Sequence, residues 1–101
     1  MKFDKRLHRE FPLDLAAGTA YYDNISSDLG NQFRVAVRET LQNVVERPES
    51  FGLVRGKLRF ASVRGFPYLV LFQVVDLTVF VAGLYHASSD PSQWLNRPIE
   101  D

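Results

Sequence analysis

Apolar and polar positions in the first half of the chain predict one short strand followed by two helices. Residues 3–8 alternate with a period of two, as a short and partly exposed strand does. From about Glu10 to Asn24 the apolar residues instead recur three or four positions apart, which is the spacing of one helix face. The residues expected on the buried face of this first helix are Leu13, Ala16, Ala17, Ala20 and Tyr21.

A second helix is expected from a turn at 24–27 to about Glu46. Residues 26–28, two serines and an aspartate, can each cap its first turn, and Pro48 stops it because a residue before proline avoids helical backbone angles. Its expected core stripe consists of Leu29, Phe33, Ala36 or Val37, Leu41 and Val44. Because only a few residues join the two helices, they should form an antiparallel hairpin with a shared apolar face.

After Pro48 the period changes to two, which predicts strands at about 57–63, 68–75 and 77–86. The residue pair 76–77 leaves room for only a tight connection between the last two strands. These two strands, YLVLFQVV and LTVFVAGLYH, are apolar on both sides, whereas an antiparallel strand with one wet face should alternate. Something is therefore expected to cover the second face of the sheet.

The elements predict one α+β domain over residues 1–101, in the order β-α-α-β-β-β, with the helical hairpin packed on a small, mainly antiparallel sheet. After a turn at 90–91, Trp94 and Leu95 should dock on the domain as one short helical turn. Because the hairpin can cover only one face, the other must be small, capped by the C-terminal segment, or shielded by a partner. The apolar character of both faces favours a partner protein.

Composition fits a single core and a reducing compartment. In a chain of 101 residues, roughly 65% of the unfolded surface is buried on folding. Apolar residues make up 46% of the chain, enough for one core without metals or disulfides. The absence of cysteine excludes a disulfide framework and thiolate chemistry. No apolar run reaches the length of a signal peptide or a membrane span, so the cytoplasm is the expected location.

Charge is balanced overall but uneven along the chain. The 12 basic and 12 acidic residues cancel, so the molecule is not expected to bind polyanions in general. Residues 53–75 nevertheless carry only basic charges, at Arg55, Lys57, Arg59 and Arg64. These cations either protect a sheet edge or contact an anionic partner, and both interpretations remain open.

No metal or cofactor site is indicated. His8 and His86 are too few and too far apart in sequence to suggest a metal site. The glycines at 52, 56 and 65 lack the spacing of a phosphate-binding loop.

The C-terminal half, VRGFPYLVLFQVVDLTVFVAGLYHASSDPSQWL, resembles the core signature of the RelE/ParE toxin superfamily. The positions that carry the resemblance are Arg64, Phe66, Pro67, Tyr68, Phe72, Val74, Leu84, His86, Asp90, Pro91 and Trp94. The N-terminal segment HREFPLDLAAGTAYYDNISSDLGNQF is similar to the family's first helix and the start of its second, and ERPESFG to the segment that follows. The resemblance therefore covers nearly the whole chain.

The resemblance implies the toxin of a type II toxin-antitoxin, or plasmid stabilisation, module. A cognate antitoxin would hold such a toxin inactive by wrapping a tail across its groove and sheet, which would supply the missing cover. The positions expected to contact the antitoxin are Tyr21, Tyr22, Phe60, Leu69 and Leu71.

The superfamily contains two unlike activities. RelE-like toxins cut mRNA on the ribosome, which needs a base for the 2′-OH and cations for the developing charge. Such nucleases carry an arginine after the tyrosine of the middle strand and basic residues after the last strand, where this chain has Leu69 and residues 87–89, ASS. The remaining candidates for catalysis are His86, Arg64, Arg59 and Lys57. His86 beside Tyr85 could form an acid-base pair, or His86 could instead bond the turn that follows it.

Loss of these cations favours the ParE-like activity, which traps DNA gyrase and needs a binding surface but no active site. The expected target-binding residues are Arg59, Arg64, Tyr85, His86 and Trp94. For Trp94 the alternative is an anchor that packs the tail onto the domain. An mRNA endonuclease acting on the ribosome remains the alternative activity.

Overall fold

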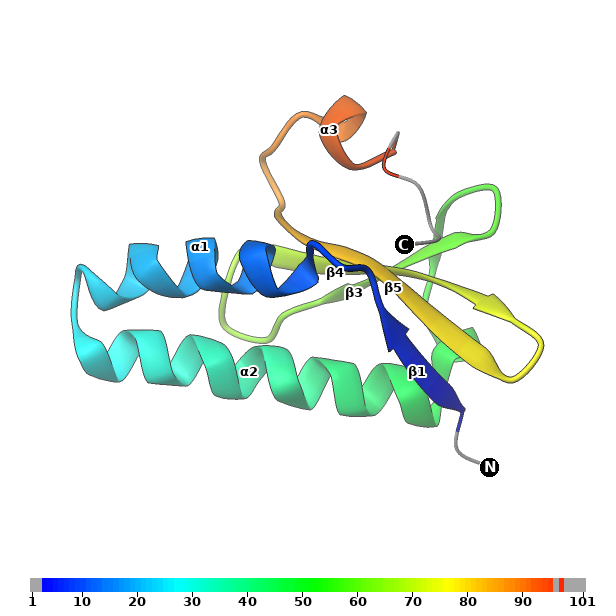
Figure 1. Cartoon of the computed structure of the whole chain (residues 1–101), viewed down its shortest axis with the longest axis horizontal. Coiled ribbons are helices and arrows are strands. Elements are labelled where there is room, and N and C mark those ends of the chain that lie inside the picture. Colours follow the sequence, from blue (N-terminus) through cyan, green and yellow to red (C-terminus); the bar gives the residue numbers. More distant parts are fainter. Residues whose placement is uncertain (1–2, 96, 98–101) are drawn as a thin grey trace.

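The computed structural model describes residues 3–95 and 97 (Figure 1). It confirms an α+β domain in which two long helices pack on one sheet. The elements are β1 (Asp4–Leu7), α1 (Phe11–Asp23), α2 (Ser27–Glu46), the 3-10 turn η1 (Pro48–Ser50), β2 (Leu53–Arg55), β3 (Leu58–Ser62), β4 (Tyr68–Val75), β5 (Thr78–His86) and α3 (Pro91–Leu95).

The sheet is mixed and has the strand order β1-β5-β4-β3-β2. β1 runs parallel to β5, with Asp4 opposite Thr78, whereas the other neighbours are antiparallel. The helical hairpin carries the chain between β1 and the meander, so that the first strand comes to lie beside the last (Figure 1).

The sheet has five strands, one more than the sequence predicted. The additional strand, β2, has only three residues, and all of them are exposed. It forms a hairpin with β3 through Gly56, whose φ of 54° favours a residue without a side chain. So short and exposed a strand has no apolar alternation from which it could be recognised.

The buried face predicted for α1 was wrong. Leu13 and Tyr21 are 68% and 62% exposed, and the three alanines of the predicted face are exposed as well. The side of α1 that faces the core instead carries Phe11, Asp14, Leu15, Gly18, Thr19 and Tyr22. α1 is apolar over most of its circumference, so periodicity alone could not select the side that is buried.

The expectations for α2 are confirmed. The Ser26 hydroxyl accepts a hydrogen bond from the Leu29 N–H at 3.0 Å, which caps the helix, and Pro48 follows its last turn. The predicted core stripe is buried except for Leu29, which is half-buried. Gly18 lets α1 approach α2 closely, because a Cβ there would lie 2.8 Å from the ring of Phe33.

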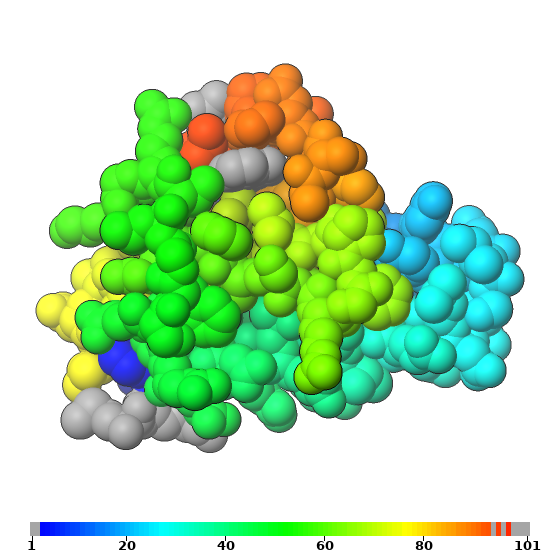
Figure 2. All heavy atoms as spheres, turned by 180° about the vertical axis from the view of Figure 1, so that it is seen from behind, coloured from blue at the N-terminus to red at the C-terminus, as the bar shows by residue number. Residues whose placement is uncertain are grey.

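A second apolar cluster lies on the sheet face opposite the helices. Leu71 is fully buried in it, and Leu95 of α3 packs against it. The cluster consists of Leu58, Leu71 and Ala82, with Phe60, Tyr85 and Leu95 packed around them. Figure 2 views the molecule from behind and shows α3 (orange) and the β2–β3 hairpin (green) on two sides of this region. The chain's own C-terminal segment, one of the three covers considered for this face, therefore covers part of it.

No helix in the described part of the chain combines the length and apolarity needed to cross a bilayer.

Candidate functional site

The carboxylate of Asp14, on the inner side of α1, accepts several hydrogen bonds. Its Oδ2 accepts hydrogen bonds from the backbone N–H of Leu84 at 3.1 Å and from Nη1 of Arg97 at 2.8 Å. Nη2 of Arg97 donates to Oδ1 at 3.2 Å, and Nη1 also donates to the carbonyl of Ala82 at 3.2 Å. One ion pair thus joins α1, β5 and the segment after α3.

Tyr85 lies beside this ion pair. The Arg97 guanidinium carbon is 4.9 Å from the centre of the Tyr85 ring, a cation–π distance. Burial raises the pKa of Tyr85 to about 12; the Arg97 charge opposes this shift, and the carboxylates of Asp14 and Glu10 add to it. Burial disfavours the charged form of Arg97, but the hydrogen bond and charge of Asp14 outweigh it and raise the pKa of Arg97 above its usual value.

Sequence reasoning missed both Asp14 and Arg97. The one available signal was the position of Asp14, which falls three residues from Phe11 and four from Gly18 and therefore shares their side of the helix. Nothing in the sequence around Arg97 pointed to a partner, because Asp14 precedes it by 83 residues. Of the predicted target-binding residues whose side chains the structure describes, only Tyr85 belongs to this group.

Two of the predicted cations, Lys57 and Arg59, lie at a hollow of about 340 Å³ near the β2–β3 hairpin. Glu49 and Asp76 line the same hollow, so its charges are mixed. Arg59 Nη1 also donates a hydrogen bond to the carbonyl of Phe51. The site is therefore poorly suited to an anion.

Arg64 lies elsewhere, in the turn between β3 and β4. It borders a shallow hollow of about 470 Å³ between that turn and α2. The hollow is also lined by Asn31, Gln32 and Glu39 among others, and Arg64 itself is exposed.

His86 ends β5 and bonds the turn that follows, one of the two roles expected for it. Its Nδ1 accepts from the Ser88 N–H at 3.1 Å and lies 2.7 Å from the Ser88 hydroxyl. Its ring meets the Tyr68 ring edge-on, with centroids 5.2 Å apart.

The sheet separates the candidate catalytic residues. His86 pairs with Tyr68, whereas Arg59 pairs with Phe72, four residues further along β4. That offset corresponds to about 13 Å along the strand. Lys57 lies further from His86 still, in the β2–β3 turn, so only Arg64 shares the end of the sheet with His86.

The residues expected to contact an antitoxin differ in accessibility. Tyr22 is buried in the core between Phe33 and Phe66, and Leu71 is buried beneath the C-terminal segment, so neither side chain is available for contact in this conformation. The accessible ones are Tyr21, which is exposed, and Phe60 and Leu69, which are half-buried. Trp94 belongs to α3, and its side chain lies outside the described part of the structure.

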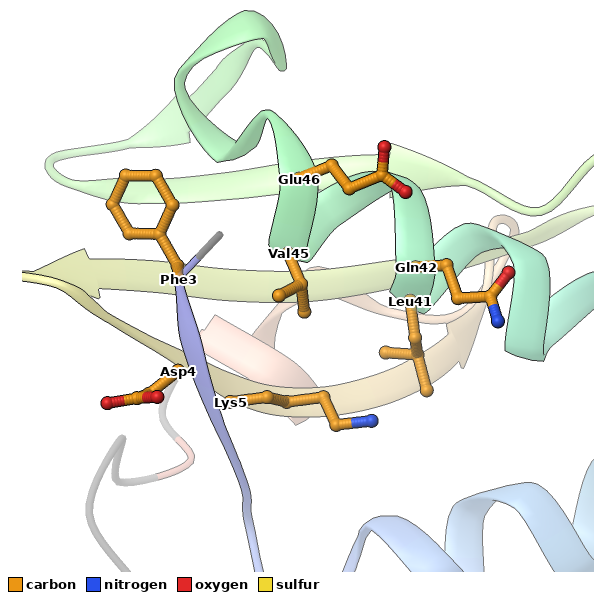
Figure 3. Close-up of a pocket in the computed structure, with 7 residues that line it drawn as sticks. All are labelled: Phe3, Asp4, Lys5, Leu41, Gln42, Val45 and Glu46. Carbon is orange, nitrogen blue, oxygen red and sulfur yellow. The ribbon is translucent and has the colours of Figure 1, made fainter. Parts of the chain in front are cut away.

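A further hollow of about 480 Å³ separates β1 from the end of α2 (Figure 3). Its lining combines the side chains Phe3, Asp4, Lys5, Leu41, Gln42, Val45 and Glu46. Figure 3 shows Lys5 directed toward the part of α2 that carries Leu41 and Gln42, and Asp4 directed away from it. The mixed lining, open to one edge of the sheet, indicates no particular ligand.

Comparison with known proteins identified no match, so a functional proposal rests on the geometry described above. The chain matches no protein-family model, and the search of curated proteins gave no match. Among the described residues, no three histidine, aspartate or glutamate side chains come together in a way that could hold a metal ion.

Proposed function

We propose that this chain has a RelE/ParE-type fold and is the toxin of a type II toxin-antitoxin, or plasmid stabilisation, module. In this proposal a cognate antitoxin neutralises the toxin, which acts in the ParE manner by binding DNA gyrase. The observation that carries the choice of activity is the separation of Lys57 and Arg59 from His86.

Cleavage of RNA by its own 2′-OH requires a base and cations around a single phosphate. Arg59 is bonded to the Phe51 carbonyl and lies about 13 Å along the sheet from His86. Arg64 is the one candidate cation at the His86 end, and residues 87–89, ASS, which directly follow His86, carry no charge. These distances favour a binding protein over a nuclease.

A gyrase-binding toxin needs accessible side chains rather than a catalytic group. Of the expected target-binding residues, Arg64 and His86 are exposed, and Arg59 and Tyr85 are half-buried. The expected antitoxin contacts Tyr21, Phe60 and Leu69 present accessible apolar surface. The order strand, helix, helix and antiparallel meander supports the RelE/ParE-type fold. In the described part of the chain, Leu95 packs on the second sheet face while Phe60 and Leu69 stay half-exposed, which is compatible with an antitoxin that lies beside the C-terminal segment.

The deciding experiment is inducible expression with and without the candidate antitoxin gene, followed by separate measurements of DNA damage and mRNA cleavage. We expect growth arrest with DNA damage signalling, rescue by the antitoxin, and inhibition of gyrase supercoiling by the purified protein. A His86→Ala, Arg64→Ala double variant tests the alternative, because a nuclease would lose its mRNA cuts. Positioned mRNA cuts that the double variant abolishes, with gyrase unaffected, would replace this proposal by the RelE-like activity. Absence of growth arrest would rule out both the gyrase-binding and the mRNA-cleaving activity.

A further inference from the structure

Arg97 lies in a pocket that other segments of the chain form around its guanidinium group. We call Asp14, Ala82, Gly83 and Tyr85 the arginine pocket; Asp14 comes from α1 and the other three from β5. Asp14 binds both terminal nitrogens of Arg97, at 2.8 and 3.2 Å, and the carbonyl of Ala82 accepts from Nη1 at 3.2 Å. The centre of the Tyr85 ring lies 4.9 Å from the guanidinium carbon, and a more exposed carboxylate, that of Glu10, lies 3.4 Å from Nη2. The pocket thus matches the parallel donors, the charge and the flat face of a guanidinium group.

The pocket is built without the segment that supplies Arg97. The N–H of Leu84 donates to Oδ2 of Asp14 at 3.1 Å and fixes the carboxylate from the side of β5. Gly83 provides the room, because a Cβ there would lie 2.8 Å from Nη1 of Arg97 and 2.5 Å from the Tyr85 ring. Since β5 pairs with β4 on one side and β1 on the other, these groups keep their places when the C-terminal segment leaves.

The segment that carries Arg97 follows a turn with hydrogen bonds of its own. The carbonyl of His86 accepts from the Ser89 N–H at 3.0 Å within this turn. α3 has only five residues, too few for a helix that is stable by itself, and it is docked through the packing of Leu95 on the second apolar cluster. The segment therefore docks or is released as a unit, while the sheet behind it stays paired.

We propose that the arginine pocket is a recognition site for the arginine side chain of a partner chain, and that Arg97 is its intramolecular occupant. The partner's side chain enters the pocket when the C-terminal segment is released. Asp14 favours this exchange, because its side chain is only 13% exposed and an empty pocket would leave its charge unpaired and poorly hydrated. Lysine is a poor substitute, since an ammonium group cannot bind both carboxylate oxygens in parallel and also lie flat on the Tyr85 ring. The inference does not depend on the toxin function, because its readout is ligand binding.

Arg97→Ala empties the pocket, which is then tested with N-acetyl-argininamide, a blocked arginine that stands for one residue of a partner chain. In an NMR titration we expect saturable binding to this variant at millimolar concentration, with shifts of the Leu84 amide and the Tyr85 ring. Wild-type protein should bind the probe at least about tenfold more weakly, because the tethered Arg97 competes at a high effective concentration. N-acetyl-lysinamide should also bind the Arg97→Ala variant at least about tenfold more weakly than the arginine probe.

The double variant D14N/R97A is the matched control, since asparagine keeps the shape of the carboxylate without its charge, and it should not bind the probe. Free L-arginine separates a metabolite from a partner chain: tighter binding of free than of blocked arginine would overturn the partner-chain assignment. Absence of binding to R97A, equal binding of the two blocked amino acids, or binding that persists in D14N/R97A would overturn the site itself. If R97A is unfolded, the arginine probe should restore its helical circular dichroism, and failure to do so would overturn the site as well.

Discussion

Arg97, at the far end of the chain, forms a two-pronged ion pair with Asp14 in the first helix, with N···O distances of 2.8 and 3.2 Å. The same guanidinium contacts the carbonyl of Ala82, and the same carboxylate contacts the N–H of Leu84. The pair therefore holds the C-terminal segment to β5 and α1, and with it the cover that this segment provides for Leu71.

Removal of the carboxylate by Asp14→Ala is expected to lower the free energy of unfolding by about 2–3 kcal/mol. The two side chains are only 13% and 14% exposed, so Arg97 and the Leu84 N–H would lose a partner in a mostly dry environment. Glu10 is the matched control, because its carboxylate lies 3.4 Å from Arg97 but is 48% exposed. Glu10→Gln should cost less than about 0.5 kcal/mol by urea denaturation.

A double-mutant cycle separates the ion pair from the packing around it. In the variant D14L/R97M neither charge remains to be buried alone, so its loss of stability should be well below the sum of the losses in Asp14→Leu and Arg97→Met. Additive losses would mean that the two side chains do not depend on each other for stability.

The pKa of Tyr85 reports whether the C-terminal segment is docked on β5 and α1. Its pKa is raised from 10.0 to about 12, mainly by burial, so the folded state retains the phenol proton longer than the unfolded state. Its contribution to stability is therefore complete below about pH 10 and is lost as the pH rises toward 12. Tyr85→Phe should reduce the loss of stability in this window, and the tyrosinate absorbance that disappears in the variant should titrate near pH 12.

The Asp14→Ala variant gives the control for this titration. If the ion pair holds the C-terminal segment over Tyr85, its loss should expose the ring and return the pKa toward 10. A Tyr85 that titrates near pH 10 in the wild-type protein would show that this segment does not shield it in solution.

The sequence predicted α2 correctly and the buried side of α1 incorrectly for one physical reason. In α2 the apolar residues occupy one side and the charged residues the other, so a single orientation buries the apolar side. In α1 both sides are apolar, and orientation is decided by contacts between distant segments, namely Gly18 on Phe33 and Asp14 on Arg97. Periodicity within one segment carries no information about such contacts.

The sequence was also unable to predict what covers the second face of the sheet. Two-sided apolarity of β4 and β5 correctly predicted that the face needs a cover, and helix formation near Leu95 was also predicted correctly. The source of the cover could not be predicted, because a partner protein and the chain's own tail bury the same side chains. A docked tail depends on Arg97 reaching Asp14, which only the folded structure brings together.

Gly18 tests how closely the two helices pack. A Cβ at this position would lie 2.8 Å from Cε2 and Cζ of Phe33, whose ring is fully buried and packs against the rings of Tyr22, Phe66 and Tyr68. Overpacking costs about 1–3 kcal/mol, and the better helix propensity of alanine offsets about 1 kcal/mol of it. Gly18→Ala should therefore destabilise the protein by about 1 kcal/mol, measured by urea denaturation. Ala16→Gly, on the exposed side, should cost only the propensity difference; a stabilised Gly18→Ala would mean that α1 and α2 are further apart.

Asp76 tests the tight connection between β4 and β5. It has a φ of 54°, a left-handed conformation that aspartate tolerates and that β-branched residues avoid. Asp76→Val should therefore destabilise the protein by about 1–2 kcal/mol, whereas Asp76→Asn should change stability by less than about 0.5 kcal/mol. Val at the exposed neighbour Leu77, which the structure does not place at positive φ, is the matched control and should be nearly neutral. Equal effects of Val at positions 76 and 77 in urea denaturation would contradict a left-handed residue at 76, and with it the turn that sets the register of the last two strands.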